Sequence, residues 1–251
     1  MALRLGTQPP GYSQAPQPTC VCGKSIDPDC HHIFRCPNGN ERQTTHDAVS
    51  HEVKKLLDAA GCATTREPYH FYVDSKSRPD LVIRSGWNDG ALPHTADIAV
   101  VHPGLSSASG RGAATCQLHA ANATARKKSV KYAANNRRHG IAEQTIPFVF
   151  EIFGAAAAKT TDHIRTLTAG VHKALPLSPG ASKDRTHTYW TRRLICVLIK
   201  GVANGVSRRL CRAYAHGGRP PPEFITRLRG FAPDPGDFAV VDAARRAGAA
   251  P

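Results

Sequence analysis

The sequence predicts an α/β fold, a sheet with helices packed against it. Three observations support this prediction. The chain has 251 residues, 41% of them hydrophobic, which is enough for one sizeable core. Segments with the spacing of amphipathic helices alternate with short segments rich in β-branched and aromatic residues. Their order is helix, three strands, helix, strand, and such an order favours a sheet covered by helices.

The first helix is expected to begin at Thr44 or Thr45 and to stop before Gly61. Either threonine can cap a helix N-terminus, and Asp47 places a negative charge in the first turn. Glycine after the last periodic residue is a typical C-terminal signal. Between these ends the apolar residues recur at helical spacing, at Val49, Val53, Leu56, Leu57 and Ala60.

The periodicity then changes to that of strands. Residues 64–73, 79–84 and 96–102 are short β-rich segments. Asn-Asp-Gly at 88–90 favours a hairpin turn between the second and third strands. We therefore expect these two strands to be antiparallel neighbours.

The second half of the chain is expected to add one more strand and further helices. Residues 117–138 are rich in alanine and lysine and predict a helix, and the apolar segment 146–153 predicts a buried strand. Residues 160–174 and 188–215 also predict helices, the second of them long and basic. From residue 216 onward the chain is rich in proline and glycine, and we expect an irregular tail.

Positive charge is concentrated in one half of the sequence. The chain has 33 Lys and Arg against 19 Asp and Glu, a formal net charge of +14. Residues 1–125 hold 11 bases and 11 acids, whereas residues 126–251 hold 22 bases and 8 acids. A regional basic surface is typical of nucleic-acid-binding proteins. No segment approaches the ~20 apolar residues of a membrane span, so no membrane partner is predicted, and no secretory signal is evident, so we expect an intracellular protein.

A cluster of cysteines and histidines near the N-terminus predicts a metal site. Three thiolates and one imidazole within seventeen residues suit tetrahedral zinc, and a set without a carboxylate is typical of a structural site. The predicted zinc ligands are Cys20, Cys22, His31 and Cys36. Cys30 and His32 are competing ligands that spacing alone does not exclude.

Two aspartates predict a second metal site. Asp80 opens one predicted strand and Asp97 opens the region of the next, so the hairpin between them would bring both carboxylates together. Carboxylate oxygens are ligands for Mg²⁺ or Mn²⁺, which can hold a scissile phosphate and its attacking water. The alternative is that each aspartate only starts a strand or caps a turn.

Cationic and aromatic residues on the predicted helix 117–138 fit the same chemistry. Lys128 lies three residues before Lys131 and four before Tyr132, so these side chains can share a helix face. An ammonium group there could stabilise a pentavalent phosphate. Glu151 stands in an otherwise apolar strand, where a buried carboxylate needs a cation or a metal. We expect it to pair with Lys131 or to contribute to the metal site.

Taken in order, these motifs resemble a known family. The set comprises the Cys/His knuckle with its His-His-Ile-Phe-Arg-Cys segment, Thr45-His46-Asp47, Arg78-Pro79-Asp80, Asp97, Lys128 with Lys131-Tyr132, and Pro147 to Gly154. It resembles the PD-(D/E)xK restriction-like endonuclease domain at the C-terminal end of site-specific non-LTR retrotransposon proteins. The segment Tyr189-Trp190-x-Arg192-Arg193-Leu194 is similar to one of algal members.

The resemblance implies a mixed sheet flanked by helices, structural zinc and catalytic Mg²⁺ or Mn²⁺. It implies that Asp80 and Asp97 hold the catalytic metal, and that Lys128 or Lys131, with Tyr132, completes the site. Ala99 stands where many such nucleases have lysine, so the lysine role is assigned to the helix. The implied organisation is a linker (1–19), a zinc knuckle (20–40), an endonuclease core (41–158), a basic helical extension (159–215) and a tail (216–251).

The expected partner is double-stranded DNA, with element RNA as a second candidate, and the expected location is the nucleus. Basic side chains are expected to grip phosphates, and the residues assigned to nucleic-acid binding are His46, Lys127, Arg192, Arg193, Lys200, Arg208 and Arg209. A reverse transcriptase needs paired aspartates after a tyrosine, and Tyr72-Val73-Asp74-Ser75 has only one. We therefore expect an endonuclease without its reverse transcriptase. The rival hypotheses are a catalytically inactive zinc-containing nucleic-acid-binding module and a free-standing junction resolvase.

Overall fold

The computed structural model describes residues 18–27, 31–73, 75–87, 92–104, 116–174 and 182–217. The chain divides into two compact units, one formed by residues 1–43 with 200–251 and the other by residues 44–199. This division differs from the predicted boundary at residue 158, because the helix that follows the last strand packs against that strand. The predicted linker and tail lie almost entirely outside the described residues.

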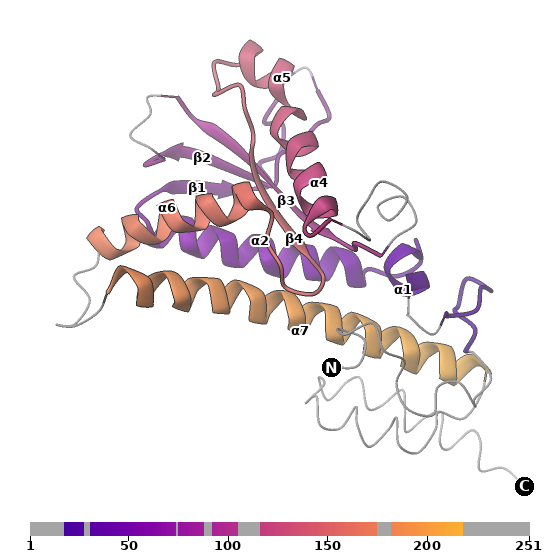
Figure 1. Ribbon diagram of the computed structural model, residues 1–251. Coiled ribbons are helices and arrows are strands. Elements are labelled where there is room, and N and C mark those ends of the chain that lie inside the picture. The colour runs from indigo at the N-terminus through magenta and orange to yellow at the C-terminus, as the bar shows by residue number, and fades with distance from the viewer. Residues whose placement is uncertain are drawn as a thin grey trace, which may run out of the picture. The chain divides into compact units, whose positions relative to one another are not determined.

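Four strands form the sheet of the unit 44–199, and they are β1 (Ala63–Arg66), β2 (Leu81–Ser85), β3 (His94–Val101) and β4 (Ile146–Glu151). Their order in the sheet is β1-β2-β3-β4. The first two pairs are antiparallel and the last is parallel, so the sheet is mixed (Figure 1). The predicted α/β class and the hairpin of the second and third strands are confirmed.

The first strand is shorter than the predicted segment 64–73. Pro68 has no amide hydrogen for a neighbouring strand, and Glu67 and His70 adopt left-handed φ values of 38° and 52°. The amide of Glu67 still donates to the carbonyl of Asp80, at 2.9 Å. After this bond the chain leaves the sheet and forms a loop.

One face of the sheet is covered by α4 (His119–Val130). Small residues make this close approach possible, since Ala121 and Ala125 of the helix pack against Val149 of β4. Ala99 of β3 pairs with Val149, so its side chain lies on the face that α4 covers. Asp97 is two residues earlier in the strand and lies on the same face. The helix therefore passes directly over the strand that carries Asp97.

The other face is covered by α2 (Glu41–Ala59) and α6 (Ala158–Ala174), which run side by side in Figure 1. His163 of α6 lies 5.9 Å, between ring centroids, from Phe148, the strand neighbour of Val149. A Cβ at Gly170 of α6 would lie 3.6 Å from Ala60, just beyond the end of α2. The unit thus has three layers, helix, sheet and helices.

The helix predicted over 117–138 is divided in two. α4 ends at Val130, and α5 (Ala133–Arg138) begins after Tyr132, whose φ and ψ of −109° and 10° are not helical. The Tyr132 ring is buried and its hydroxyl donates to the carbonyl of Arg78, at 2.9 Å. The break therefore places this tyrosine between the helix and the start of β2.

A long helix, α7 (Lys183–Gly217), begins five residues before its predicted start and extends through both units. In the unit 44–199, Arg193 of α7 pairs with the buried carboxylate of Glu52 on α2. In the other unit, α7 packs against residues of the predicted knuckle, which includes the short helix α1 (His31–Arg35).

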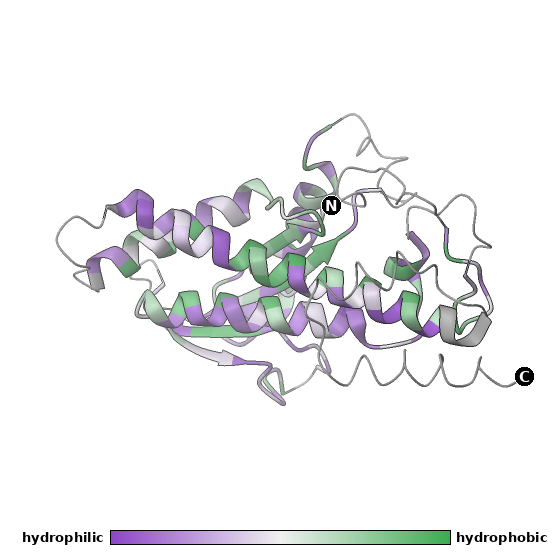
Figure 2. Cartoon of the chain, turned by 90° about the horizontal axis from the view of Figure 1, so that it is seen from below, coloured by the Kyte–Doolittle hydropathy of each residue, from purple (hydrophilic) through white to green (hydrophobic). Residues whose placement is uncertain are grey.

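Hydrophobic residues concentrate in the strands, and the helices show alternating polar and apolar faces (Figure 2). The burial pattern agrees, because all six residues of β4 are buried. Within the described ranges, no helix is both long enough and apolar enough to cross a membrane.

Candidate functional site

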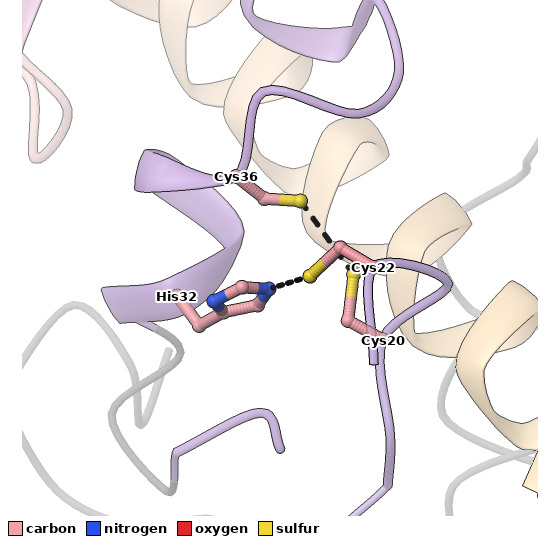
Figure 3. A group of neighbouring side chains, drawn as sticks. All are labelled: Cys20, Cys22, His32 and Cys36. Atoms are coloured by element: carbon pink, nitrogen blue, oxygen red, sulfur yellow. Dashed lines mark hydrogen bonds between the residues drawn. The ribbon is translucent and has the colours of Figure 1, made fainter. Parts of the chain in front are cut away.

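The unit 1–43 with 200–251 contains a cluster of metal-ligand side chains. The ligand atoms of Cys20, Cys22, His32 and Cys36 all lie within 4.8 Å of one another. Figure 3 shows Cys22 facing His32 and Cys20 facing Cys36, with Sγ to Nε2 at 3.2 Å and Sγ to Sγ at 3.7 Å. A tetrahedral zinc with Zn–S bonds of about 2.3 Å has S–S edges of about 3.8 Å. The four side chains therefore fit one zinc ion.

The histidine of this cluster is His32, so the prediction of His31 is wrong. Neighbouring residues of a helix project about 100° apart, so only one of the two can face the thiols. Cys36 follows His32 by four residues, and its amide donates to the His32 carbonyl at 2.8 Å, so the two share a helix face. Cys30, the other competing ligand, lies outside the described residues.

Local hydrogen bonds orient the short helix that carries His32. The carboxylate of Asp27 accepts the amide hydrogens of His31 and His32, at 2.8 Å and 2.7 Å. An acidic side chain at a helix N-terminus satisfies donors that have no partner within the helix and interacts favourably with the helix dipole. Asp27 is therefore a positioning residue for the cluster, which the sequence interpretation missed.

A buried arginine lies against the thiols. Arg209 of α7 is only 3% exposed, and its guanidinium is 3.9 Å from Cys20 Sγ and 2.8 Å from the carboxylate of Glu41. Burial favours the neutral Cys36 thiol, but the Asn38 amide and Arg209 overcome this and lower its pKa. The assignment of Arg209 to DNA phosphates is wrong, because its guanidinium is committed to Glu41 and the cysteines.

In the unit 44–199, the two predicted carboxylates lie side by side. Leu81 of β2 pairs with Ala96 of β3, so Asp80 and Asp97 occupy the next opposed position along the hairpin. The Oδ2 atom of Asp80 accepts the amide hydrogen of Ile98, the residue after Asp97, at 2.6 Å. The antiparallel register thus brings together residues that are seventeen positions apart.

Residues at the C-terminal end of α4 surround Asp97, which is 1% exposed. Lys128 forms an ion pair with its Oδ2, and the Lys131 ammonium lies 3.4 Å from its Oδ1. The Tyr132 hydroxyl also lies 3.3 Å from Oδ1. The predicted convergence of both lysines and the tyrosine on the carboxylates is present in the structure.

The electrostatics of the two aspartates differ. Burial, together with the neighbouring charge of Asp80, raises the pKa of Asp97, and the two lysines oppose this rise. Burial also disfavours the charged form of Asp80, but the hydrogen bond and charge of His46 overcome it and lower the pKa of Asp80. In this structure the charge of Asp97 is therefore compensated by Lys128 and Lys131, and that of Asp80 by His46.

His46 joins this site from α2. Its Nε2 lies 3.2 Å from Asp80 Oδ2 and its Nδ1 lies 3.2 Å from Asp47 Oδ1. The hydrogen bond with Asp80 raises the pKa of His46 to about 9, against the opposing effect of burial. His46 was assigned to nucleic-acid binding; in the structure its imidazole orients a carboxylate of the site.

Glu151 is separate from the carboxylate pair, so its predicted pairing with Lys131 is wrong. It pairs with Val101 in the β3–β4 register, whereas Asp97 pairs with Pro147, four residues earlier. Burial raises the pKa of Glu151, and a hydrogen bond from the Ala121 amide in the first turn of α4 opposes this. Its carboxylate therefore lies at the N-terminus of α4, while Lys128 and Lys131 lie at the other end of that helix.

The remaining basic residues have different surroundings. Lys127, Arg192 and Lys200 are exposed and remain candidates for phosphate contacts, and Arg208 is half-buried. Arg193 pairs with Glu52, and its guanidinium lies 5.4 Å from the centroid of the Trp190 ring. Arg193 thus has a role in packing α7 on α2.

A buried polar network beside the carboxylates was not predicted. The Tyr72 hydroxyl donates to Asn136 of α5, and the Asn136 amide donates to Thr95 Oγ1 at 2.9 Å. Thr95 in turn lies 3.0 Å from the hydroxyl of Thr145. These residues are spread over 74 positions, so no local pattern reveals the network. It fixes the loop after β1 against α5.

Comparison with protein families, with curated proteins and with solved structures yields no match to this chain.

Proposed function

We propose that this chain is a metal-dependent DNA endonuclease that nicks its target by hydrolysing a phosphodiester bond. The convergence of the Asp80 and Asp97 carboxylates with the Lys128 ammonium carries the proposal. Asp80 directly precedes β2, Asp97 lies in β3 and Lys128 lies in α4, so the lysine comes from the helix, as the resemblance to the PD-(D/E)xK domain of non-LTR retrotransposon proteins implies. The proposal includes an origin in a non-LTR retrotransposon, whose endonuclease provides a nick for priming reverse transcription.

Asp80 and Asp97 would hold Mg²⁺ or Mn²⁺, since both ions take hard oxygen ligands. The raised pKa of Asp97, caused by burial beside a second carboxylate, supports a cation at this position. When bound, such a metal polarises a phosphoryl oxygen and lowers the pKa of its water. The fit of the metal therefore rests on the two carboxylates as a set of oxygen donors.

The other side chains have separate roles in the proposed reaction. Lys128 provides a positive charge beside the carboxylates, where charge develops on the phosphate in the transition state. The single hydroxyl hydrogen of Tyr132 is shared between the Arg78 carbonyl, at 2.9 Å, and Asp97 Oδ1, at 3.3 Å, so Tyr132 helps to position Asp97. Lys131, whose side chain is 46% exposed, is better placed to hold a neighbouring phosphate. We assign the catalytic lysine role to Lys128 because its ammonium is closer to Asp97 and more buried.

The Cys/His cluster supports a second part of the proposal, a structural zinc ion bound by Cys20, Cys22, His32 and Cys36. Three thiolates and an imidazole leave no open coordination position in a tetrahedral site. The local hydrophobic core is small, with Ile26, Ile33, Val206, Leu210 and Ala213 beside the cysteines. Zinc would therefore supply stability that this core is too small to provide.

A plasmid-nicking assay with Mg²⁺ or Mn²⁺ tests the nuclease. We expect Asp80→Asn and Asp97→Asn to lower the nicking rate by at least about 100-fold, because metal ligation supplies several kcal/mol to the transition state. The matched control is Glu143→Gln, which changes an exposed carboxylate paired with Arg137. Equal nicking by the aspartate variants and the wild type would exclude the proposed site.

The same assay separates the two lysines. Lys128→Met should lose more activity than Lys131→Met, because the Lys128 ammonium is the more buried partner of Asp97. The reverse order would transfer the catalytic role to Lys131. Circular dichroism and salt-dependent DNA binding, measured on each variant, distinguish loss of chemistry from loss of folding.

A catalytically inactive nucleic-acid-binding module is the second candidate. One observation favours it: Asp97 is 1% exposed and already paired with Lys128, as in a purely structural ion pair. Such a module would bind DNA with the salt dependence of a basic protein and would nick with neither Mg²⁺ nor Mn²⁺. The wild-type nicking assay therefore decides between the two candidates.

A further inference from the structure

The loop between β1 and β2 displays an aromatic side chain to solvent. Tyr69 is 83% exposed, and Val73 in the same loop is 91% exposed. The guanidinium of Arg78 lies 5.2 Å from the centroid of the Tyr69 ring, and the Arg78 side chain is itself held by an ion pair with Glu67 at 2.9 Å. The loop thus presents an aromatic ring with a fixed cation beside it.

This ring is displayed by a well-anchored loop. Tyr72, three residues later, is buried and bonded to Asn136 of α5. Residues on either side of Pro68-Tyr69 adopt left-handed φ values, 38° at Glu67 and 52° at His70. Non-glycine residues in this region carry a conformational cost, and such positions are frequent at ligand-binding sites. The backbone therefore holds Tyr69 outward at a cost in stability.

The loop is bonded directly to the carboxylate site. The Glu67 amide donates to the Asp80 carbonyl at 2.9 Å, and the Arg78 carbonyl accepts the Tyr132 hydroxyl at 2.9 Å. Tyr69 is two residues from Glu67, and two residues of chain reach at most about 7 Å, even when fully extended. Successive phosphates of one DNA strand are about 3.4 Å apart along the helix axis. Tyr69 is therefore within a few nucleotides of a phosphate bound at the carboxylates.

The chemistry of this surface fits a nucleobase. An exposed tyrosine ring offers a flat face for base stacking, and a neighbouring guanidinium adds a cation–π contribution. Lys76 is also exposed in the same loop and adds a positive charge to it. A base inside a duplex has both faces covered by its neighbours, so only an unpaired or extruded base can occupy the ring.

We propose that Tyr69 and Arg78 form a stacking platform for an unpaired nucleobase next to the scissile phosphate. This inference rests on the proposed nuclease function and specifies its substrate class as DNA with an unpaired nucleotide at or near the nick. Tyr69 is a specificity-determining residue in this proposal. The exposed position of the ring explains why removing it should leave the fold intact.

The test uses a DNA duplex with a single unpaired 2-aminopurine, whose fluorescence is quenched on stacking, in Ca²⁺ in place of Mg²⁺. We expect Tyr69→Ala to weaken binding of this probe by at least about tenfold and to lose the quenching, since base stacking on an aromatic ring is worth about 1–3 kcal/mol. Tyr69→Phe, which keeps the ring, should retain both. Binding of the fully paired duplex should be unchanged in each variant.

The matched control is Tyr189→Ala on α7, because Tyr189 is 54% exposed and also has an arginine, Arg193, 5.9 Å from its ring centroid. Equal affinity and equal quenching for wild type and Tyr69→Ala would overturn the platform. This result is distinguishable from failure of the nuclease proposal. If Tyr69→Ala loses quenching but the wild type does not nick DNA, the platform is retained in a binding module. If the wild type nicks DNA but Tyr69→Ala leaves quenching unchanged, only the nuclease is retained.

Discussion

The Cys/His cluster and the carboxylate site both offer ligands for a divalent cation, but the chain builds them in different ways. The four cluster ligands lie within seventeen residues and are surrounded by a small core. The carboxylate site combines α2, β2, β3 and α4, over residues 46–132, and is supported by the hydrophobic core of its own unit. If both proposed metals are bound, we expect the metal to stabilise the fold around the first site, whereas the second site is assembled by a fold that does not depend on its metal.

Removal of the proposed zinc ion should have the largest effect on stability. Structural zinc contributes on the order of 10 kcal/mol to small domains. We expect chelation, or Cys36→Ser, to abolish hydrogen-exchange protection in residues 18–43 and 200–213 while strands β1–β4 remain protected. The reason is that Cys36 is both a ligand and part of the local core.

Cys116→Ser is the matched control, because Cys116 is an exposed thiol outside the cluster. Bound zinc, measured by a chromogenic chelator, should be one ion per chain in the control and absent in Cys36→Ser. Full protection of both units after chelation would show that the cluster folds without metal.

The difference between residues that are close in sequence and residues that only the tertiary fold brings together explains what could be predicted from the sequence. The Cys/His cluster is predictable because the spacing of its residues is local, and only the choice between His31 and His32 depends on which one shares a helix face with Cys36. The proximity of Asp80 and Asp97 is predictable because they adjoin consecutive strands, and such strands commonly pair in antiparallel register, as β2 and β3 do.

The other incorrect assignments depend on tertiary contacts. Glu151 was placed near the lysines because a buried carboxylate needs a partner, but its partner is the backbone of α4. Arg209 was assigned to phosphates from its charge, although Glu41, 168 residues earlier, accepts its hydrogen bond. The network of Tyr72 and Asn136 has no local signature at all.

Acid should destabilise the unit 44–199 through a buried imidazole. His163 of α6 lies 5.5 Å, between ring centroids, from Trp87, and burial lowers its pKa from 6.5 to about 4. The unfolded state binds the extra proton between these two values, so stability is complete above about pH 6.5 and falls as the pH drops toward 4. The loss should be about 2–3 kcal/mol, given the partial exposure of this residue.

Urea unfolding, monitored by tryptophan fluorescence, measures this loss of stability, because both tryptophans, Trp87 and Trp190, belong to the unit 44–199. Stability measured between pH 7.5 and 4.5 should fall less steeply in His163→Phe, which cannot take up a proton. An identical pH dependence in both proteins would show that His163 does not control the acid sensitivity. The unit 44–199 should therefore respond to acid through a buried histidine of its core, whereas the stability of the other unit should depend on a metal.

A substitution of Glu151 should have the smallest effect. It tests whether this carboxylate caps a helix or binds a metal. Glu151→Gln removes a negative charge from the N-terminus of α4 while retaining an oxygen that can accept the Ala121 amide. Charges at helix ends are typically worth about 0.3–1 kcal/mol, so the free energy of unfolding should change by no more than about 1 kcal/mol. The raised pKa of Glu151 makes the lower end of this range the expected result. Nicking should match the wild type, because Glu151 lies four register positions from Asp97, and a loss comparable to that of Asp97→Asn would restore Glu151 to the active site.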